Sequence, residues 1–198
     1  MSDVEAQTPR ERRWPLLVVT ALILLAIAAL AWDQRPWADS SDGDGLGMRE
    51  DHTPRRGGDA PDFVLENERG ERVALSDFEG RPVFLNFWAT WCTYCIDEMP
   101  DMQRVQERYG DELVVIGVNA GDSVEDGEAF AARTGVSYLR LYDHDMEVTD
   151  GYLVQAMPTS YFITADGRIW DANFGYMTYD DMIEHVEGAM SGELEGRR

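Results

Sequence analysis

The feature that most restricts the fold is an apolar, strand-like run that leads directly into a pair of cysteines. Residues 83–88 read Val-Phe-Leu-Asn-Phe-Trp, and Cys92 and Cys95 follow shortly after. Such a run is typical of a strand buried in a sheet that is covered on both faces. From residue 96 onward, apolar side chains recur at mostly helical spacing, which predicts an amphipathic helix. The cysteines are therefore expected where a buried strand gives way to a helix.

This position favours redox chemistry at the two thiols. Unpaired N–H groups and the dipole at a helix start stabilise negative charge, so a thiol there loses its proton more readily. We expect Cys92 to be the exposed, attacking thiolate and Cys95, one turn later, to close a disulfide onto it. The alternatives are two buried structural cysteines or half of a zinc site, which needs a second ligand pair. Because the three histidines are scattered, we predict no metal and no cofactor beyond a redox-active Cys92–Cys95 disulfide.

The segment around the cysteines resembles the active-site segment of the thioredoxin superfamily. With its flanks, the chain is similar to the TlpA/ResA-like branch of membrane-anchored, extracytoplasmic thiol–disulfide oxidoreductases. The stretches that carry the resemblance are Ala-Pro-Asp-Phe at 60–63, Leu-Ser-Asp-Phe-Glu-Gly at 75–80, the cysteine segment from Asn86 through Glu98 and Pro100, and Met-Pro-Thr at 157–159. They occur in the family's order and spacing, so the resemblance covers roughly residues 59 to 190.

The resemblance implies an α/β, thioredoxin-like fold with a mixed central sheet flanked by helices and an added N-terminal β-hairpin. The residue pattern agrees with it. Strands are expected at 63–65, 72–75, 83–88, 113–118, 138–142, 160–164 and 168–172, with helices after the third, fourth and fifth of them. Asp166-Gly167 predicts a type I′ hairpin turn. Asp122 or Ser123 and then Thr178 are the expected caps of the later helices, and Pro100 is expected to kink the cysteine helix.

An uncharged apolar run near the N-terminus predicts a transmembrane helix. It is just long enough to cross a bilayer, and arginines on its amino side favour a cytoplasmic N-terminus. The alternatives are a cleaved signal peptide, ending near Ala29-Leu30-Ala31, or a buried helix. The predicted division is a cytoplasmic segment at 1–13, a transmembrane anchor at 14–32, a flexible linker at 33–58, the thioredoxin-like domain at 59–190 and a tail at 191–198.

The charge of the chain limits its partners. The net charge is −21, and all basic residues other than histidine are arginine. So acidic a chain lacks the basic surface that nucleic acids require, and it repels anionic lipid headgroups. We therefore predict no nucleic-acid partner, and membrane attachment through the N-terminal helix.

Several residues near the cysteines are expected to belong to the site. Asn86 stands where most cytoplasmic thioredoxins carry a proton-handling carboxylate, and asparagine cannot exchange protons near neutral pH. The resemblance instead ties Glu98, one turn past Cys95, to the disulfide chemistry; otherwise it is an ordinary exposed acid. It also implies a cis Met157–Pro158 bond, with Met157 backbone groups pairing with a bound substrate segment. Trp91 is the better candidate for substrate surface, and Trp88 is core or surface.

The predicted function is that of an enzyme: an extracytoplasmic, membrane-anchored thiol–disulfide oxidoreductase that reduces cysteine-containing protein substrates. The resemblance suggests a role in cytochrome c maturation and a membrane electron-donor protein as partner. One alternative is a thioredoxin-like copper chaperone, although that type uses a wider cysteine spacing and a downstream histidine. Another is a thiol peroxidase, because residues 60–63 also open peroxiredoxin-like chains, although Thr90 stands at the wrong offset from Cys92 for that family.

Overall fold

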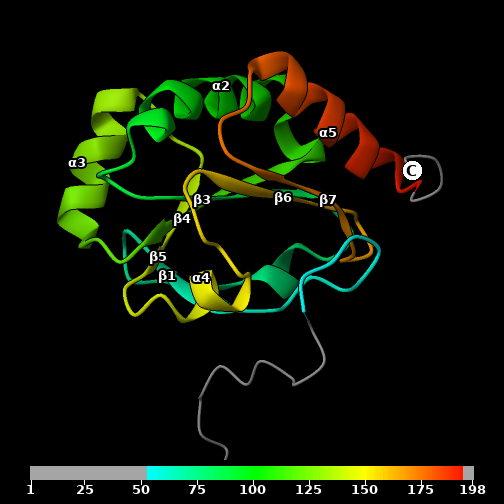
Figure 1. The fold of residues 1–198 in the computed structure, drawn as a ribbon, viewed down its shortest axis with the longest axis horizontal. Coiled ribbons are helices and arrows are strands. Elements are labelled where there is room, and N and C mark those ends of the chain that lie inside the picture. Colours follow the sequence, from blue (N-terminus) through cyan, green and yellow to red (C-terminus); the bar gives the residue numbers. More distant parts are fainter. Residues whose placement is uncertain (1–52, 194–198) are drawn as a thin grey trace, which may run out of the picture. The chain divides into compact units, whose positions relative to one another are not determined.

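The computed structural model describes residues 53–193, which form a mixed sheet of seven strands. The strands lie in the order β2-β1-β5-β4-β3-β6-β7 (Figure 1). Their bounds are β1 Val64–Asn67, β2 Arg72–Ala74, β3 Val83–Trp88, β4 Val114–Ala120, β5 Leu139–Asp143, β6 Thr159–Ile163 and β7 Ile169–Phe174. β3, β4 and β5 are parallel neighbours, and the other pairs are antiparallel. The predicted mixed sheet is confirmed. Helical crossovers join the parallel strands, and short turns join β1 to β2 and β6 to β7.

Helices cover both faces of this sheet. Their bounds are α2 Thr93–Tyr109, α3 Val124–Thr134, α4 Glu147–Gly151 and α5 Tyr179–Ser191, with 3-10 helices η1 Leu75–Phe78 and η2 Gly110–Glu112. α2, α3 and α5 lie on one face, and α4 and η1 lie on the other (Figure 1). Alternate β3 residues supply the two cores: Phe84 and Trp88 pack under the larger helices, and Leu85 and Phe87 pack on the α4 side. β3 is thus buried along its whole length.

The helix boundaries follow the capping signals in the sequence. Ser123 Oγ accepts a hydrogen bond from the backbone N–H of Asp126 at the start of α3, and Thr178 caps α5 in the same way. Gly135 ends α3 in the left-handed conformation. α2 continues from the cysteines through Pro100 to Tyr109. The cysteine pair therefore opens a helix that packs along the sheet.

The turn between β6 and β7 differs from the predicted type I′ hairpin. The N–H of Gly167 donates to the carbonyl of Thr164, and only Gly167 of this turn has positive φ. A type I′ turn would also require positive φ at Asp166. The chain instead makes a turn over Thr164–Gly167 and leaves Gly167 as the left-handed residue that leads into β7. The strands accordingly end at Ile163 and resume at Ile169.

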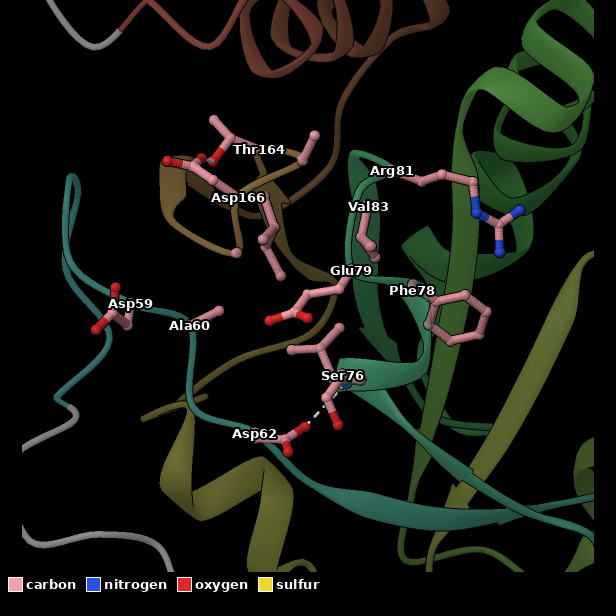
Figure 2. A pocket seen from close by; sticks show the side chains of 14 residues that line it. Asp59, Ala60, Asp62, Ser76, Phe78, Glu79, Arg81, Val83, Thr164 and Asp166 are labelled. Carbon is pink, nitrogen blue, oxygen red and sulfur yellow. Dashed lines mark hydrogen bonds between the residues drawn. The ribbon is translucent and has the colours of Figure 1, made fainter.

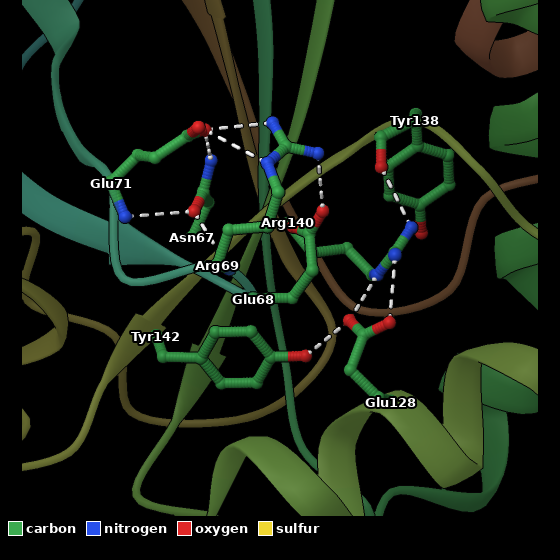
Figure 3. Close-up of polar contacts among 8 residues, drawn as sticks. All are labelled: Asn67, Glu68, Arg69, Glu71, Glu128, Tyr138, Arg140 and Tyr142. Atoms are coloured by element: carbon green, nitrogen blue, oxygen red, sulfur yellow. Dashed lines mark hydrogen bonds and ion pairs between the residues drawn. The ribbon is translucent and has the colours of Figure 1, made fainter.

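Polar contacts join α3 to the sheet and shape the β1–β2 turn. Arg140 Nε and Nη2 on β5 donate to the two carboxylate oxygens of Glu128 on α3, at 2.7 and 2.9 Å, and the Tyr142 hydroxyl donates to the same carboxylate (Figure 3). The hydrogen bond from Arg140 lowers the pKa of Glu128. In the β1–β2 turn, Asn67 Oδ1 accepts from the N–H of Arg69. The first set of contacts holds α3 against β5, and the second shapes the turn of the first hairpin.

The predicted cytoplasmic segment, the anchor at 14–32 and most of the linker lie outside the described residues, as does the end of the tail. Within residues 53–193, no helix has the length and apolar character needed to cross a bilayer.

Candidate active site

The two cysteines lie where β3 leads into α2. The N–H of Cys92 donates to the carbonyl of Ala89 at 3.1 Å, which closes a tight turn after the strand. Cys92 is the N-cap of α2, and its sulfur accepts a hydrogen bond from the N–H of Cys95 at 3.2 Å. The two cysteines are joined by a disulfide. Upon reduction, the same N–H and the helix dipole would stabilise a Cys92 thiolate.

Both cysteines are buried in the oxidised protein, so the expected exposure of Cys92 is wrong for this state. Cys92 is 4% exposed and Cys95 is 1% exposed. Both belong to the core cluster that α2 forms with β3 and α5, because the turn after β3 folds the N-terminus of α2 onto that core. Cys92 is the more exposed of the two cysteines. A reaction partner must therefore approach the disulfide from the side of Cys92.

Glu98 is the most unusual residue of the site. It lies on α2 three residues after Cys95, which places the two side chains one turn apart on the same buried face. Its side chain has no exposed surface. Burial raises the pKa of Glu98 to about 7, although its hydrogen bonds favour the charged form. Glu98 is thus a buried acid that exchanges its proton near neutral pH, and the alternative of an exposed surface acid is excluded.

The Glu98 carboxylate is held by groups from two other parts of the chain. Asn86 Nδ2 on β3 donates to Oε1 at 2.8 Å, and the N–H of Met177, before α5, donates to Oε2 at 3.0 Å. Asn86 also donates to the hydroxyl of Ser160 on β6 at 2.9 Å. Asn86 therefore does not exchange a proton near neutral pH, but it positions the Glu98 carboxylate, which can.

Two exposed aromatic residues lie next to the cysteines in the chain. Trp91 is 68% exposed and Tyr94 is 64% exposed, and they flank Cys92 in the sequence. The ring of Tyr94 lies 6.4 Å from that of Tyr176, in the loop that contacts Glu98. Trp88, in contrast, is fully buried and stacks on Phe130. Trp88 is therefore a core residue, and the interpretation of it as substrate surface is wrong. Apolar rings presented beside a reactive disulfide suit an apolar segment of a protein substrate.

The Met157–Pro158 bond is cis, as predicted. Pro158 directly precedes β6, whose first residue, Thr159, pairs with Phe87 near the end of β3. Met157 is half-buried and packs against the core cluster that contains both cysteines. The carbonyl of Pro158 is already engaged by the N–H of Gly175. Only Met157 of this pair can therefore offer backbone groups to a bound segment.

A pocket of about 400 Å³ lies at the opposite end of the sheet and takes no part in this site (Figure 2). It is lined by residues next to the start of β3 and the end of β6, including Asp62, Glu79 and Asp166. The register pairs Val83, the first residue of β3, with Ile163, the last of β6, whereas the cysteines follow the other end of β3.

Several residues that shape the site carry no local signal in the sequence. Ser160 and the N–H of Met177 reach Glu98 or its partner from 74 and 79 residues away in the chain. Asp122 was expected only as a helix cap, yet Ser123 has that role and Asp122 contacts Thr90 beside the cysteines. Among residues 53–193 no group of three or more acidic, histidine or cysteine side chains could hold a metal ion.

Known proteins similar to this chain include several thiol–disulfide oxidoreductases. The chain is 36% identical over 141 residues to thiol-disulfide oxidoreductase ResA of Bacillus subtilis, and the match spans 71% of this chain and 79% of that protein. It is 34% identical over 179 residues to ResA of Halalkalibacterium halodurans, spanning 90% and 95%.

Solved structures agree in fold. A Chlorobium tepidum protein described as a thiol:disulfide interchange protein DsbE superposes with a TM-score of 0.65 at 30% identity, over 69% of this chain and 99% of that one. DsbF of Mycobacterium tuberculosis superposes with a TM-score of 0.61 at 26% identity, over 65% and 95%. The fold is therefore thioredoxin-like.

A family model described as the AhpC/TSA family matches residues 57–172, which include both cysteines, Glu98 and Pro158. The chain belongs to this thioredoxin-like AhpC/TSA family and, within it, groups with the ResA thiol–disulfide oxidoreductases.

Proposed function

We propose that this oxidoreductase is a membrane-anchored reductant of protein disulfides on the extracytoplasmic side. The observation that supports thiol–disulfide exchange at this cysteine pair most strongly is the buried Glu98 carboxylate one turn from Cys95, with a pKa raised by burial to about 7. The reductive direction is the one that the family resemblance suggests. A reductant must deprotonate its second thiol during each turnover. A carboxylate with this pKa can accept that proton near neutral pH.

The reaction proceeds in two exchanges. The Cys92 thiolate attacks one sulfur of the substrate disulfide, so that a mixed disulfide forms and one substrate thiolate leaves. Cys95 then transfers its proton to Glu98 and attacks the Cys92 sulfur. The Cys92–Cys95 disulfide closes, and the second substrate thiolate is released. The substrate gains two electrons, and a dithiol donor, which we place in a membrane protein, must return two electrons to this chain.

The substrates that fit this site are proteins with a cysteine beside apolar residues. Trp91 and Tyr94 offer exposed rings on either side of Cys92, and Met157 offers backbone groups beside the cis bond. We include the haem-attachment cysteines of apocytochrome c among these substrates. Cytochrome c maturation is the role that the family resemblance suggests.

The catalytic part of the proposal is tested with purified protein. Wild type should reduce a disulfide-bonded protein when a dithiol is supplied, Cys92→Ser should be inactive, and Cys95→Ser should accumulate a mixed disulfide at Cys92. Iodoacetamide should label reduced wild type first at Cys92, whose pKa should lie below the usual thiol value of about 8.5. Labelling of Cys95 first would reverse the roles, and peroxide turnover without protein-disulfide reduction would favour the peroxidase alternative.

The location is tested in cells. An impermeant thiol reagent should label Cys92 in whole cells after reduction, and the protein should stay in the membrane fraction until residues 1–32 are removed. A cysteine that is labelled only after lysis would contradict the proposed topology.

Loss of c-type cytochromes in a strain that carries Cys92→Ser would support the maturation role. Stoichiometric copper binding that His144→Ala abolishes would instead support the chaperone alternative.

A further inference from the structure

A carboxylate outside the proton pathway holds the turn that carries Cys92. Asp122 lies in the loop between β4 and α3, and its Oδ2 accepts from the backbone N–H of Thr90 at 2.7 Å. Its Oδ1 accepts from the Thr90 hydroxyl at 2.8 Å. One side chain therefore fixes both the backbone and the side chain of a residue two positions before the attacking cysteine.

Thr90 is a central residue of the turn that sets the position of Cys92. The turn runs from Ala89 to Cys92, closed by the hydrogen bond between their backbone groups at 3.1 Å. The pairing of β3 with β4 ends at Trp88, so backbone hydrogen bonds of the sheet do not restrain the turn at residues 89–92. Asp122 supplies the restraint in its place. The turn restrained by Asp122 then holds Trp91 at the surface and Cys92 at the N-cap of α2.

Asp122 is itself anchored to the neighbouring strands. Asn119, near the end of β4, donates from Nδ2 to Asp122 Oδ2 at 2.8 Å and accepts from the N–H of Asp122 at 3.2 Å. Asn119 is fully buried and pairs with Trp88 across the sheet. His144, after β5, lies with Nδ1 2.9 Å from the carbonyl of Asp122, which it binds in the tautomer that carries a proton there. The restraint on Thr90 thus rests on the ends of three adjacent strands.

We infer that Asp122 is a positioning residue for thiol–disulfide exchange: it fixes the Thr90–Trp91 turn, and thereby the alignment of Cys92 with Cys95. Asp122 touches no reacting atom. Its effect should appear in how readily the two thiols close into a disulfide, because closure depends on how well they are held together. This inference rests on the redox activity proposed above and adds a residue to that site.

Charge and geometry are separated by the choice of variants. In Asp122→Asn, the amide oxygen can replace Oδ2 and accept from both N–H donors, and the amide nitrogen can donate to the Thr90 hydroxyl. That variant keeps the contacts and loses the charge. Asp122→Ala loses both. Thr90→Val removes one contact without changing any charge.

The matched control is Asp166→Ala. Asp166 also accepts a hydrogen bond from a threonine, Thr164, and it lies in the β6–β7 turn at the far end of the sheet (Figure 2). The Asp166→Ala substitution removes a contact between a carboxylate and a threonine in a turn that lies far from the cysteines. A general loss of stability would therefore appear in this variant as well.

The measurement is the equilibrium constant for oxidation of Cys92 and Cys95 in glutathione redox buffers, with urea unfolding as a check on stability. Asp122→Ala should shift the constant toward the dithiol by about tenfold, the size expected for the loss of one or two hydrogen bonds. Thr90→Val should shift it in the same direction by less. Asp122→Asn and Asp166→Ala should stay within about twofold of wild type on the same scale.

Equal shifts in Asp122→Ala and Asp122→Asn, with none in Thr90→Val, would assign the effect to charge and overturn the positioning role. An unchanged constant in Asp122→Ala would also overturn it. Wild type that forms no reversible disulfide in these buffers would instead refute the proposed function itself, so the two failures are distinguishable.

Discussion

Asn86 on β3 donates a 2.8 Å hydrogen bond to the carboxylate of Glu98 on α2, and both side chains are buried. The strand position beneath the disulfide therefore holds an amide, while the ionisable group comes from the helix that carries Cys95. This arrangement places the proton acceptor on the same helix as the thiol that must lose its proton. It also makes Asn86 a residue whose replacement should change the titration of Glu98.

Replacing Asn86 with aspartate should place two carboxylates within hydrogen-bonding distance in the core. Two such groups cannot both ionise, so Asn86→Asp should raise the pKa of Glu98 and couple the two titrations. The unfolding free energy at pH 8 should fall by about 2 kcal/mol or more, because the aspartate adds a buried negative charge that no positive charge offsets. Urea unfolding checks this, with Asn86→Leu as the uncharged control; equal losses in both variants at pH 5 and pH 8 would contradict it.

The raised pKa of Glu98 predicts a pH-dependent stability of the oxidised protein. Glu98 ionises near 4.5 in the unfolded chain and near 7 in the folded one, so the folded state holds the proton more tightly. Stability from this group is fully present below pH 4.5 and is lost as the pH rises through 7. Between pH 5 and pH 8, wild type should lose about 2–3 kcal/mol relative to Glu98→Gln.

Urea unfolding of the two oxidised proteins at several pH values measures this difference. All other titrating groups are shared, so their effects cancel in the comparison. Parallel stability curves would show that Glu98 titrates alike in the folded and unfolded chains.

The exposed ring of Trp91 should serve protein substrates and be dispensable for small ones. Trp91→Ala should lower kcat/KM for a disulfide-bonded protein by about tenfold, as for a central aromatic contact of an interface. Its rate with glutathione disulfide should stay unchanged. Phe78→Ala, which removes a ring at the far end of the sheet, is the matched control. Equal loss on both kinds of substrate would place Trp91 in the chemistry rather than in recognition.

Local signals were sufficient to predict most elements and the reactive pair. The buried run at 83–88, the caps Ser123 and Thr178, and the cysteines at the start of α2 all stand where their residue types predict. These features depend on neighbours in the chain. The type I′ prediction for the β6–β7 turn is wrong because Asp-Gly also fits a longer hairpin loop, in which Gly167 alone has positive φ and follows the turn over Thr164–Gly167.

The surroundings of the disulfide could not be predicted in the same way. The burial of Cys92 and the complete burial of Glu98 result from packing of α2 against β3, β6 and the loop before α5. The link between Asp122 and Thr90 joins two loops that meet only because β3 and β4 are parallel neighbours. Distances of this kind follow from tertiary structure and leave no local pattern.

The role of Glu98 is tested by the rate at which Cys95 resolves a mixed disulfide at Cys92. A nitrothiobenzoate adduct on Cys92 is prepared, and release of the coloured thiol is followed by stopped flow from pH 5 to pH 9. Wild type should show a rise centred near the Glu98 pKa of about 7, and Glu98→Gln should lose that rise. At pH 7 the variant should be slower by about tenfold or more, because it lacks the general base. Superimposable pH profiles for the two proteins would contradict the assignment of Glu98 as the acceptor of the Cys95 proton.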